Sequence, residues 1–105
     1  MFEFDSSPGH TGPRPHVHRE HVDAFYVLEG ELEFFLAGET LTVAAGSFVA
    51  AEPGVVHTFA NRGPGRARFL NLHAPGMRFD EYFRRMAAGE DGRAFHESFD
   101  SYFDD

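Results

Sequence analysis

Short apolar runs alternate with turn residues along the first 75 positions of the chain. The runs are rich in aromatic and β-branched side chains, and Gly, Pro and Asn punctuate them, as is typical of strands joined by tight turns. The pattern predicts about eight strands, within residues 2–5, 16–19, 24–29, 31–36, 40–43, 48–51, 55–60 and 66–74. Many short strands at regular spacing indicate an all-β sandwich or barrel.

Glu29-Gly30 separates two of these runs and predicts a hairpin turn between them. Residues 6–15 contain three Pro and two Gly, which predicts a loop.

The apolar spacing becomes helical after Pro75-Gly76. One face of a helix ending near Gly89 would carry Phe79, Tyr82, Phe83, Met86 and Ala87. The sequence of the tail after Gly89 predicts either a second helical turn or an extended arm. Four aromatic residues of this tail stand among acidic residues: Phe95, Phe99, Tyr102 and Phe103. Because exposing four aromatic side chains to water is unfavourable, we expect the tail to pack on the barrel or on a partner.

The chain has 105 residues, which allows a single domain with a modest core. We therefore expect a barrel over residues 1–75 and a packed helix and tail over residues 76–105. The formal net charge of −8 argues against nucleic acid and anionic membranes as partners, since these require basic patches. The N-terminus has no basic segment followed by an apolar run, and no stretch approaches a membrane span, so we expect a cytoplasmic protein.

The chain contains no Cys and seven His, so any metal site must use imidazole and carboxylate ligands. His16 and His18 are two positions apart, and on a strand both would point to the same face. Asp23 starts the next predicted strand, and His57 lies on a later strand that could face the first pair in a barrel. Three imidazoles and one carboxylate suit a divalent ion of iron, manganese, nickel, cobalt, copper or zinc. Such a site leaves one or two positions open for water, dioxygen or substrate.

These residues resemble the two sequence motifs of the cupins, a superfamily of small β-barrels. The first motif has His-x-His, three or four residues, an acid, six residues and Gly, and it matches His16 through Asp23 to Gly30. The second has Gly, five residues, Pro-x-Gly, two residues, His, three residues and Asn, and it matches Gly46 through His57 to Asn61. The resemblance covers about residues 8–75. It implies a double-stranded β-helix, or jelly-roll, barrel.

Among the departures from the cupin pattern, two concern the candidate site, and a third is the leading Gly of the first motif, which is displaced. Asp23 stands where the family usually has Glu, so it either ligates directly, reaches the ion through water, or leaves a three-His site. Glu52 replaces the first Pro of the second motif and would add negative charge to the pocket rim.

Further residues are candidates for a substrate pocket. The apolar ones either fill the core or form a pocket wall, and the polar pair on the last strand faces either the pocket or solvent. The candidates are Phe25, Val27, Phe34, Phe48, Glu52, Phe59, Asn71 and His73. We expect His21 to be either exposed or placed beside the ligands.

The resemblance implies a metal-dependent enzyme that acts on a small organic molecule, with dioxygenase, isomerase or decarboxylase chemistry. A non-catalytic module that binds or senses a small molecule is the alternative, and a metal-free structural barrel is a third reading. No residue stands out as a separate general base. Because barrels of this family commonly pair, and because the aromatic tail adds apolar surface, we expect a homodimer.

Overall fold

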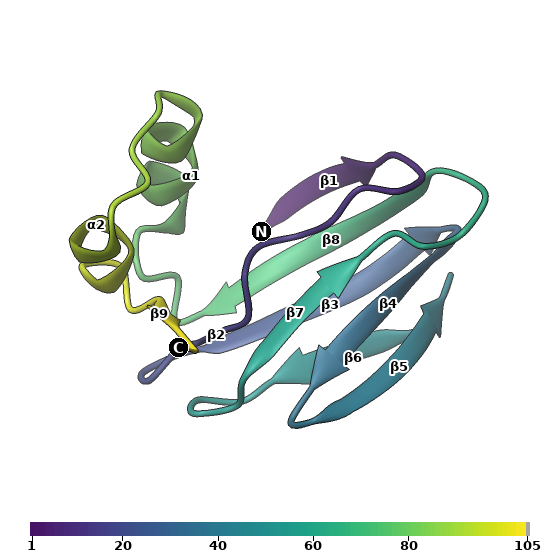
Figure 1. The fold of residues 1–105 in the computed structure, drawn as a ribbon, viewed down its shortest axis with the longest axis horizontal. Coiled ribbons are helices and arrows are strands. Elements are labelled where there is room, and N and C mark those ends of the chain that lie inside the picture. The colour runs from purple at the N-terminus through teal and green to yellow at the C-terminus, as the bar shows by residue number, and fades with distance from the viewer. Residues whose placement is uncertain (105) are drawn as a thin grey trace.

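The computed structural model describes residues 1–104, which form two antiparallel β-sheets packed face to face, with two short helices at one end (Figure 1). The first sheet has the strand order β1 (Phe2–Ser6), β8 (Ala67–Ala74), β3 (Val22–Glu29), β6 (Phe48–Ala51). The second has the order β5 (Glu39–Ala44), β4 (Glu31–Leu36), β7 (His57–Ala60), β2 (His16–Val17), β9 (Tyr102–Phe103). The predicted all-β, jelly-roll architecture is confirmed.

Alternation along the strands determines what faces the interior. In β3, Asp23, Phe25 and Val27 are buried between the sheets, whereas Tyr26 is exposed on the outside. This period of two is a property of the extended backbone, in which successive side chains point to opposite faces. The same strand therefore supplies apolar side chains to the core and a carboxylate to the site.

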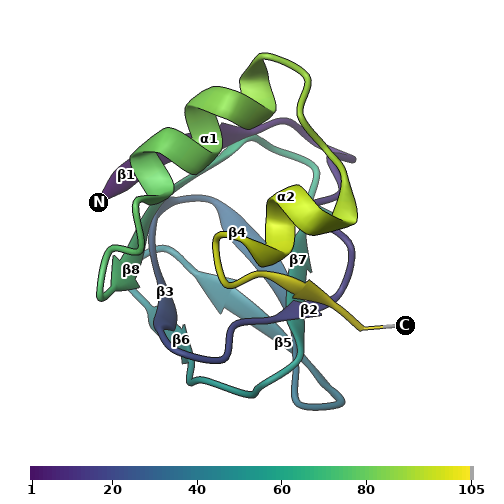
Figure 2. The ribbon, with the colours of Figure 1, turned by 90° about the vertical axis from the view of Figure 1, so that its left-hand side faces the viewer.

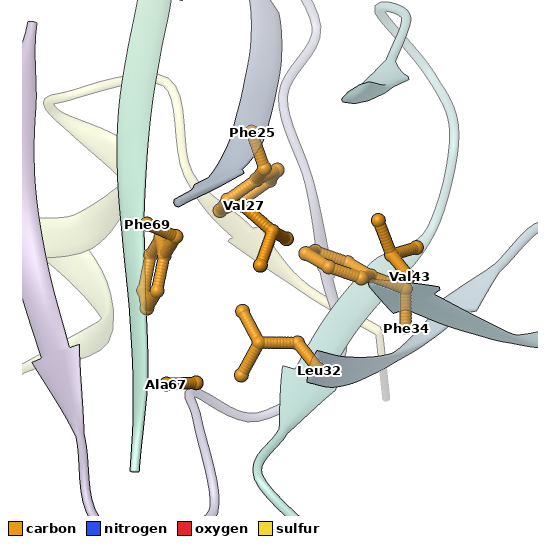
Figure 3. Packing of buried hydrophobic residues seen from close by; sticks show 7 residues of the cluster. All are labelled: Phe25, Val27, Leu32, Phe34, Val43, Ala67 and Phe69. Carbon is orange, nitrogen blue, oxygen red and sulfur yellow. The ribbon is translucent and has the colours of Figure 1, made fainter. Parts of the chain in front are cut away.

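The core lies between the sheets (Figure 3). Each sheet contributes part of one cluster, whose buried members are Phe25, Val27, Leu32, Phe34, Val43, Ala67 and Phe69. Burying a Val, Leu or Phe side chain stabilises a fold by about 1.5–3 kcal/mol. This cluster fixes how the two sheets face each other and hence where the polar residues at the barrel end meet.

The predicted hairpin at Glu29-Gly30 is wrong, because β3 and β4 lie in different sheets. The chain crosses between the sheets at Gly30, whose φ is 71°. A Cβ there would lie 2.5 Å from the carbonyl oxygen of Arg66, so the crossing requires glycine both for its backbone conformation and for space.

Helix α1 (Phe79–Ala87) confirms the predicted helical spacing, and it buries Phe79 and Tyr82. Beyond it, the tail forms both structures proposed as alternatives: a helical turn, α2 (Arg93–Glu97), and then the extended strand β9. β9 pairs with β2, with Val17 opposite Tyr102 and His16 opposite Phe103. Figure 2 shows α2 and β9 in front of the strands at this end, with α1 alongside.

No helix within residues 1–104 combines the length and the apolar character that crossing a membrane requires.

Candidate metal centre

Four buried side chains from separate parts of the sequence meet at the end of the barrel beneath the tail. They are His16 on β2, His18 just after it, Asp23 on β3 and His57 on β7. Each offers a ligand atom, and these atoms all lie within 4.8 Å of one another. His16 and His57 are direct partners across the β2–β7 pair, so the sheet register holds two of the imidazoles side by side.

Backbone carbonyl groups orient all three imidazoles. His16 donates its Nδ1–H to the carbonyl oxygen of Arg14 at 2.8 Å, and His57 donates to that of Val55 at 2.9 Å. His18 donates its Nδ1–H to the carbonyl oxygen of Asp100 at 2.8 Å. A carbonyl oxygen can only accept, so the proton of each neutral ring lies on Nδ1 and the lone pair on Nε2. This arrangement is characteristic of metal-ligating histidines.

The Asp23 carboxylate faces two of these Nε2 atoms. Its Oδ2 lies 3.2 Å from Nε2 of His18 and 2.9 Å from Nε2 of His57. Burial alone would raise the pKa of Asp23, but its hydrogen bonds with His18 and His57 hold that pKa below its usual range. With Nδ1 protonated, a neutral ring presents a lone pair at Nε2, so these close approaches to the carboxylate oxygen favour positive charge at the site, either as an added proton on an imidazole or as a bound cation.

Extra protons are a poor source of that positive charge. Burial, and then the neighbouring His57 and His18, lower the pKa of His16 to about 4. Two or three imidazolium ions packed together in a buried cluster would repel one another. The donor set, three nitrogens and one carboxylate, therefore fits a borderline divalent metal ion.

Residues 2–73 match the family described as "Cupin domain". The chain belongs to the cupin family. Its buried His/Asp cluster is of the kind that could hold the divalent metal that cupins commonly bind.

Two examples show how similar known proteins are to this chain. The chain is 27% identical over 97 residues to quercetin 2,3-dioxygenase of Bacillus subtilis (strain 168), which covers 90% of this chain and 28% of the relative. It is 31% identical over 75 residues to the HTH-type transcriptional regulator PuuR of Escherichia coli (strain K12), covering 71% and 40%. This cupin thus spans well under half the length of these two relatives.

Among solved structures, an uncharacterized conserved protein with a double-stranded β-helix domain from Klebsiella pneumoniae is similar. It has 33% sequence identity and a TM-score of 0.65, covering 70% of this chain and 64% of that one.

A line of buried hydrogen bonds in this cupin continues from Asp23 away from the ligands. Asn71 donates from Nδ2 to Asp23 Oδ1 at 2.7 Å, and His73 donates from Nε2 to Asn71 Oδ1 at 2.8 Å. His73 and His21 are hydrogen-bonded at 2.9 Å, and His21 Nδ1 lies 2.8 Å from Asp100 Oδ2. Of the two positions expected for His21, the structure shows the one beside the ligands.

These two histidines are buried, and the ring of Phe79 packs against both. Burial, and then the neighbouring His18, lowers the pKa of His21. Burial lowers the pKa of His73 to about 3. The line therefore holds Asp23 in place through Asn71, and burial makes the charged form of both histidines less favourable.

A cavity of about 560 Å³ opens beside the cluster. His16, His18 and Asp23 line it together with aromatic side chains from the barrel and α1, namely Phe4, Phe25, Phe59, Phe69, Phe79, Tyr82 and Phe83. Of the predicted pocket residues, Phe25, Phe59, Asn71 and His73 line this cavity.

The other four predicted pocket residues lie elsewhere. Val27 and Phe34 belong to the core between the sheets. Phe48 is 64% exposed on the outer face of the first sheet, because it lies opposite Tyr26, which points outward. Glu52 is also exposed, beyond the end of β6.

Four polar residues of this region were not predicted from the sequence: Asp91, His96, Asp100 and Ser101, which lie along the tail. The available signal was that His96, Asp100 and Ser101 stand within a strongly aromatic segment whose packing would carry them to the barrel end.

Proposed function

We propose that this cupin binds one divalent transition metal ion through His16, His18, His57 and Asp23, and that it acts on a small organic molecule in the adjoining cavity. The observation that carries the proposal is the geometry around Asp23. Two imidazoles, each with Nδ1 held by a carbonyl group, turn Nε2 toward one carboxylate oxygen.

Bound there, the ion would polarise a substrate oxygen or activate dioxygen at its open coordination positions. The surrounding protein would exclude water and hold the apolar part of the substrate against the phenylalanine rings of the wall. The dioxygenase among the relatives supports oxygenase chemistry, and isomerisation is the second reaction class consistent with an open metal site.

The alternative is a non-catalytic module that binds or senses a small molecule. Its support is the similarity to a transcriptional regulator over 75 residues, of which this chain spans 40%. Such a module would use the same metal and cavity for affinity alone.

Turnover separates the two functions. Untagged protein, loaded in turn with iron, manganese, nickel, cobalt, copper or zinc, is incubated under air with quercetin and other aromatic hydroxy and oxo compounds. Oxygen uptake or a product peak that is lost in His57→Ala supports an enzyme, and tight binding without product supports the binding module. If no compound binds or reacts with any metal-loaded form, both functions are rejected.

We also propose a homodimer in the cytoplasm, formed through the outer face of the first sheet. Tyr26 and Phe48 lie opposite each other on β3 and β6 and are 41% and 64% exposed, and Leu72 on β8 is 43% exposed. Three large apolar side chains on one sheet face would be covered by the same face of a second copy.

A further inference from the structure

A second polar cluster lines the cavity, formed by side chains outside the four candidate ligands. Tyr82 Oη lies 2.7 Å from Nδ1 of His96, and Nε2 of His96 lies 2.8 Å from Oδ1 of Asp91. All three residues line the cavity that His16 and His18 also line.

The cluster runs from solvent to the buried end of the cavity. Tyr82 on α1 and His96 on α2 are both buried. The Asp91 side chain, in the connection between the two helices, is 87% exposed. A carboxylate in contact with water is therefore joined through a buried imidazole to a buried phenol.

The acceptor at Asp91 determines where the protons lie. A carboxylate only accepts, so His96 donates its Nε2–H to Asp91, and neutral His96 accepts the Tyr82 hydroxyl proton at Nδ1. Carboxylate, imidazole and hydroxyl follow one another in the order used by hydrolytic triads, with a phenol in place of the serine hydroxyl.

Two contacts place this cluster close to the candidate metal centre. The His96 ring packs on Phe103 with a centroid distance of 4.9 Å, and Phe103 is the β9 partner of His16. Tyr82 is also hydrogen-bonded with Ser101, which follows the residue whose carbonyl group holds His18. Burial raises the pKa of Tyr82 to about 12, so at neutral pH the group is a protonated phenol.

We propose that Tyr82 is an acid–base residue that moves a proton on the substrate, with His96 and Asp91 as its positioning residues. The inference rests on the proposed metal-dependent function and names its substrate class: an oxo compound with an apolar or aromatic body and an acidic C–H next to the carbonyl group. The aromatic wall fits the body, and the metal centre fits the oxygen.

The step balances without another reactant. The substrate C–H bond breaks, its electron pair forms the enolate double bond, and the carbonyl oxygen takes the negative charge. The proton goes to Tyr82 Oη while the former hydroxyl proton moves to Nδ1 of His96. The resulting imidazolium is balanced by Asp91, and the reverse transfer returns a proton to the carbon or the oxygen.

The test is hydrogen–deuterium exchange of phenylpyruvate, an aromatic oxo acid with acidic C–H bonds next to its carbonyl group. Metal-loaded protein in D₂O is followed by proton NMR at saturating probe. General acid–base groups contribute roughly 10²–10⁴-fold to rates, so we expect Tyr82→Phe to lose at least about tenfold of the exchange rate. The half-saturating probe concentration should stay unchanged, because the phenol acts on the proton rather than on binding.

Two further variants and one control sharpen the result. His96→Gln keeps an acceptor for the Tyr82 hydroxyl but cannot take up its proton, so it should lose exchange as Tyr82→Phe does. Asp91→Asn should show a smaller loss. Tyr102→Phe removes a hydroxyl from the same tail, outside the cavity lining, and should exchange at the wild-type rate.

Metal content, measured on the same samples, keeps the two proposals apart. A protein that binds no metal contradicts the proposed function. A metal-loaded protein contradicts this inference if it exchanges phenylpyruvate protons no faster than the free metal ion does. Equal exchange rates in wild type and Tyr82→Phe contradict it as well.

Discussion

His18 donates its Nδ1–H to the backbone carbonyl oxygen of Asp100 at 2.8 Å, although 82 positions separate the two residues. The side chain of Asp100 accepts hydrogen bonds from the backbone N–H groups of Arg19 and Glu20, and it is hydrogen-bonded to His21. One residue of the tail thus holds four consecutive residues of the loop that carries a candidate ligand. The C-terminal tail is therefore part of the candidate metal centre.

We predict that Asp100→Ala weakens metal binding about 10- to 100-fold, the usual effect of losing groups that orient a ligand. The backbone carbonyl group survives the substitution, but the loop loses the carboxylate that fixes its position. Isothermal titration with zinc measures the affinity. Asp104→Ala is the matched control, because the Asp104 side chain is exposed in the same tail. Equal affinity in Asp100→Ala and wild type would show that the tail does not support the site.

The metal-free protein should lose stability as the pH falls below about 6.5. The pKa of His16 is lowered to about 4 and that of His73 to about 3, from an ordinary value of 6.5. Between pH 6.5 and these lowered pKa values, the two histidines bind protons in the unfolded chain but stay neutral in the folded state. Each residue therefore costs up to about 1.4 kcal/mol of unfolding free energy per pH unit.

Above pH 6.5 these histidines are neutral in both the folded and the unfolded state. Their contribution to the pH dependence of stability therefore vanishes there. Urea unfolding at pH 7.5, 6.5, 5.5 and 4.5 measures the slope. His73→Gln should make it shallower, whereas substitution of the exposed His10 by Gln should leave it unchanged. A free energy of unfolding that increases as the pH falls from 6.5 to 4.5 would contradict the burial of neutral imidazoles.

Asp23→Glu should retain the metal, since the longer carboxylate is the one the cupin motif usually carries at this position. Asp23→Asn should bind more weakly, because it removes the negative charge between His18 and His57. Metal content after dialysis against a weak chelator compares the two variants. Loss of metal in Asp23→Glu would mean that the shorter side chain is required.

Phe48→Glu should convert the proposed dimer to a monomer, because it places a charge beside Tyr26 on the exposed apolar face of the first sheet. Leu41→Glu is the control: Leu41 is also exposed, but it lies on β5 in the other sheet. Light scattering at micromolar concentration reads out the mass. A monomeric wild type, or a Phe48→Glu variant that stays dimeric, would rule out this interface.

Local sequence signals predicted the strands and the helix, because alternation and helical spacing are properties of short segments. They also brought His16, His18, Asp23 and His57 together as one candidate set, through motif spacing. They do not predict in which sheet a strand lies, so they predict a hairpin where the chain crosses between the sheets at Gly30.

Long-range packing accounts for the residues that were misplaced or missed. Phe48 faces outward because its pairing with β3 sets which side of β6 faces solvent. Asp100 and His96 reach the site only because the tail folds back over the barrel end and pairs with β2. No short-range pattern carries that information.

The metal content of untagged protein, purified without chelator and measured by elemental mass spectrometry, tests the central claim most directly. Wild type should hold about one equivalent of a divalent transition metal, as a single three-His, one-carboxylate site predicts. His57→Ala should lose most of it, and substitution of the exposed His10 by Ala should match wild type. Equal metal content in wild type and His57→Ala, or none in wild type, would contradict the account.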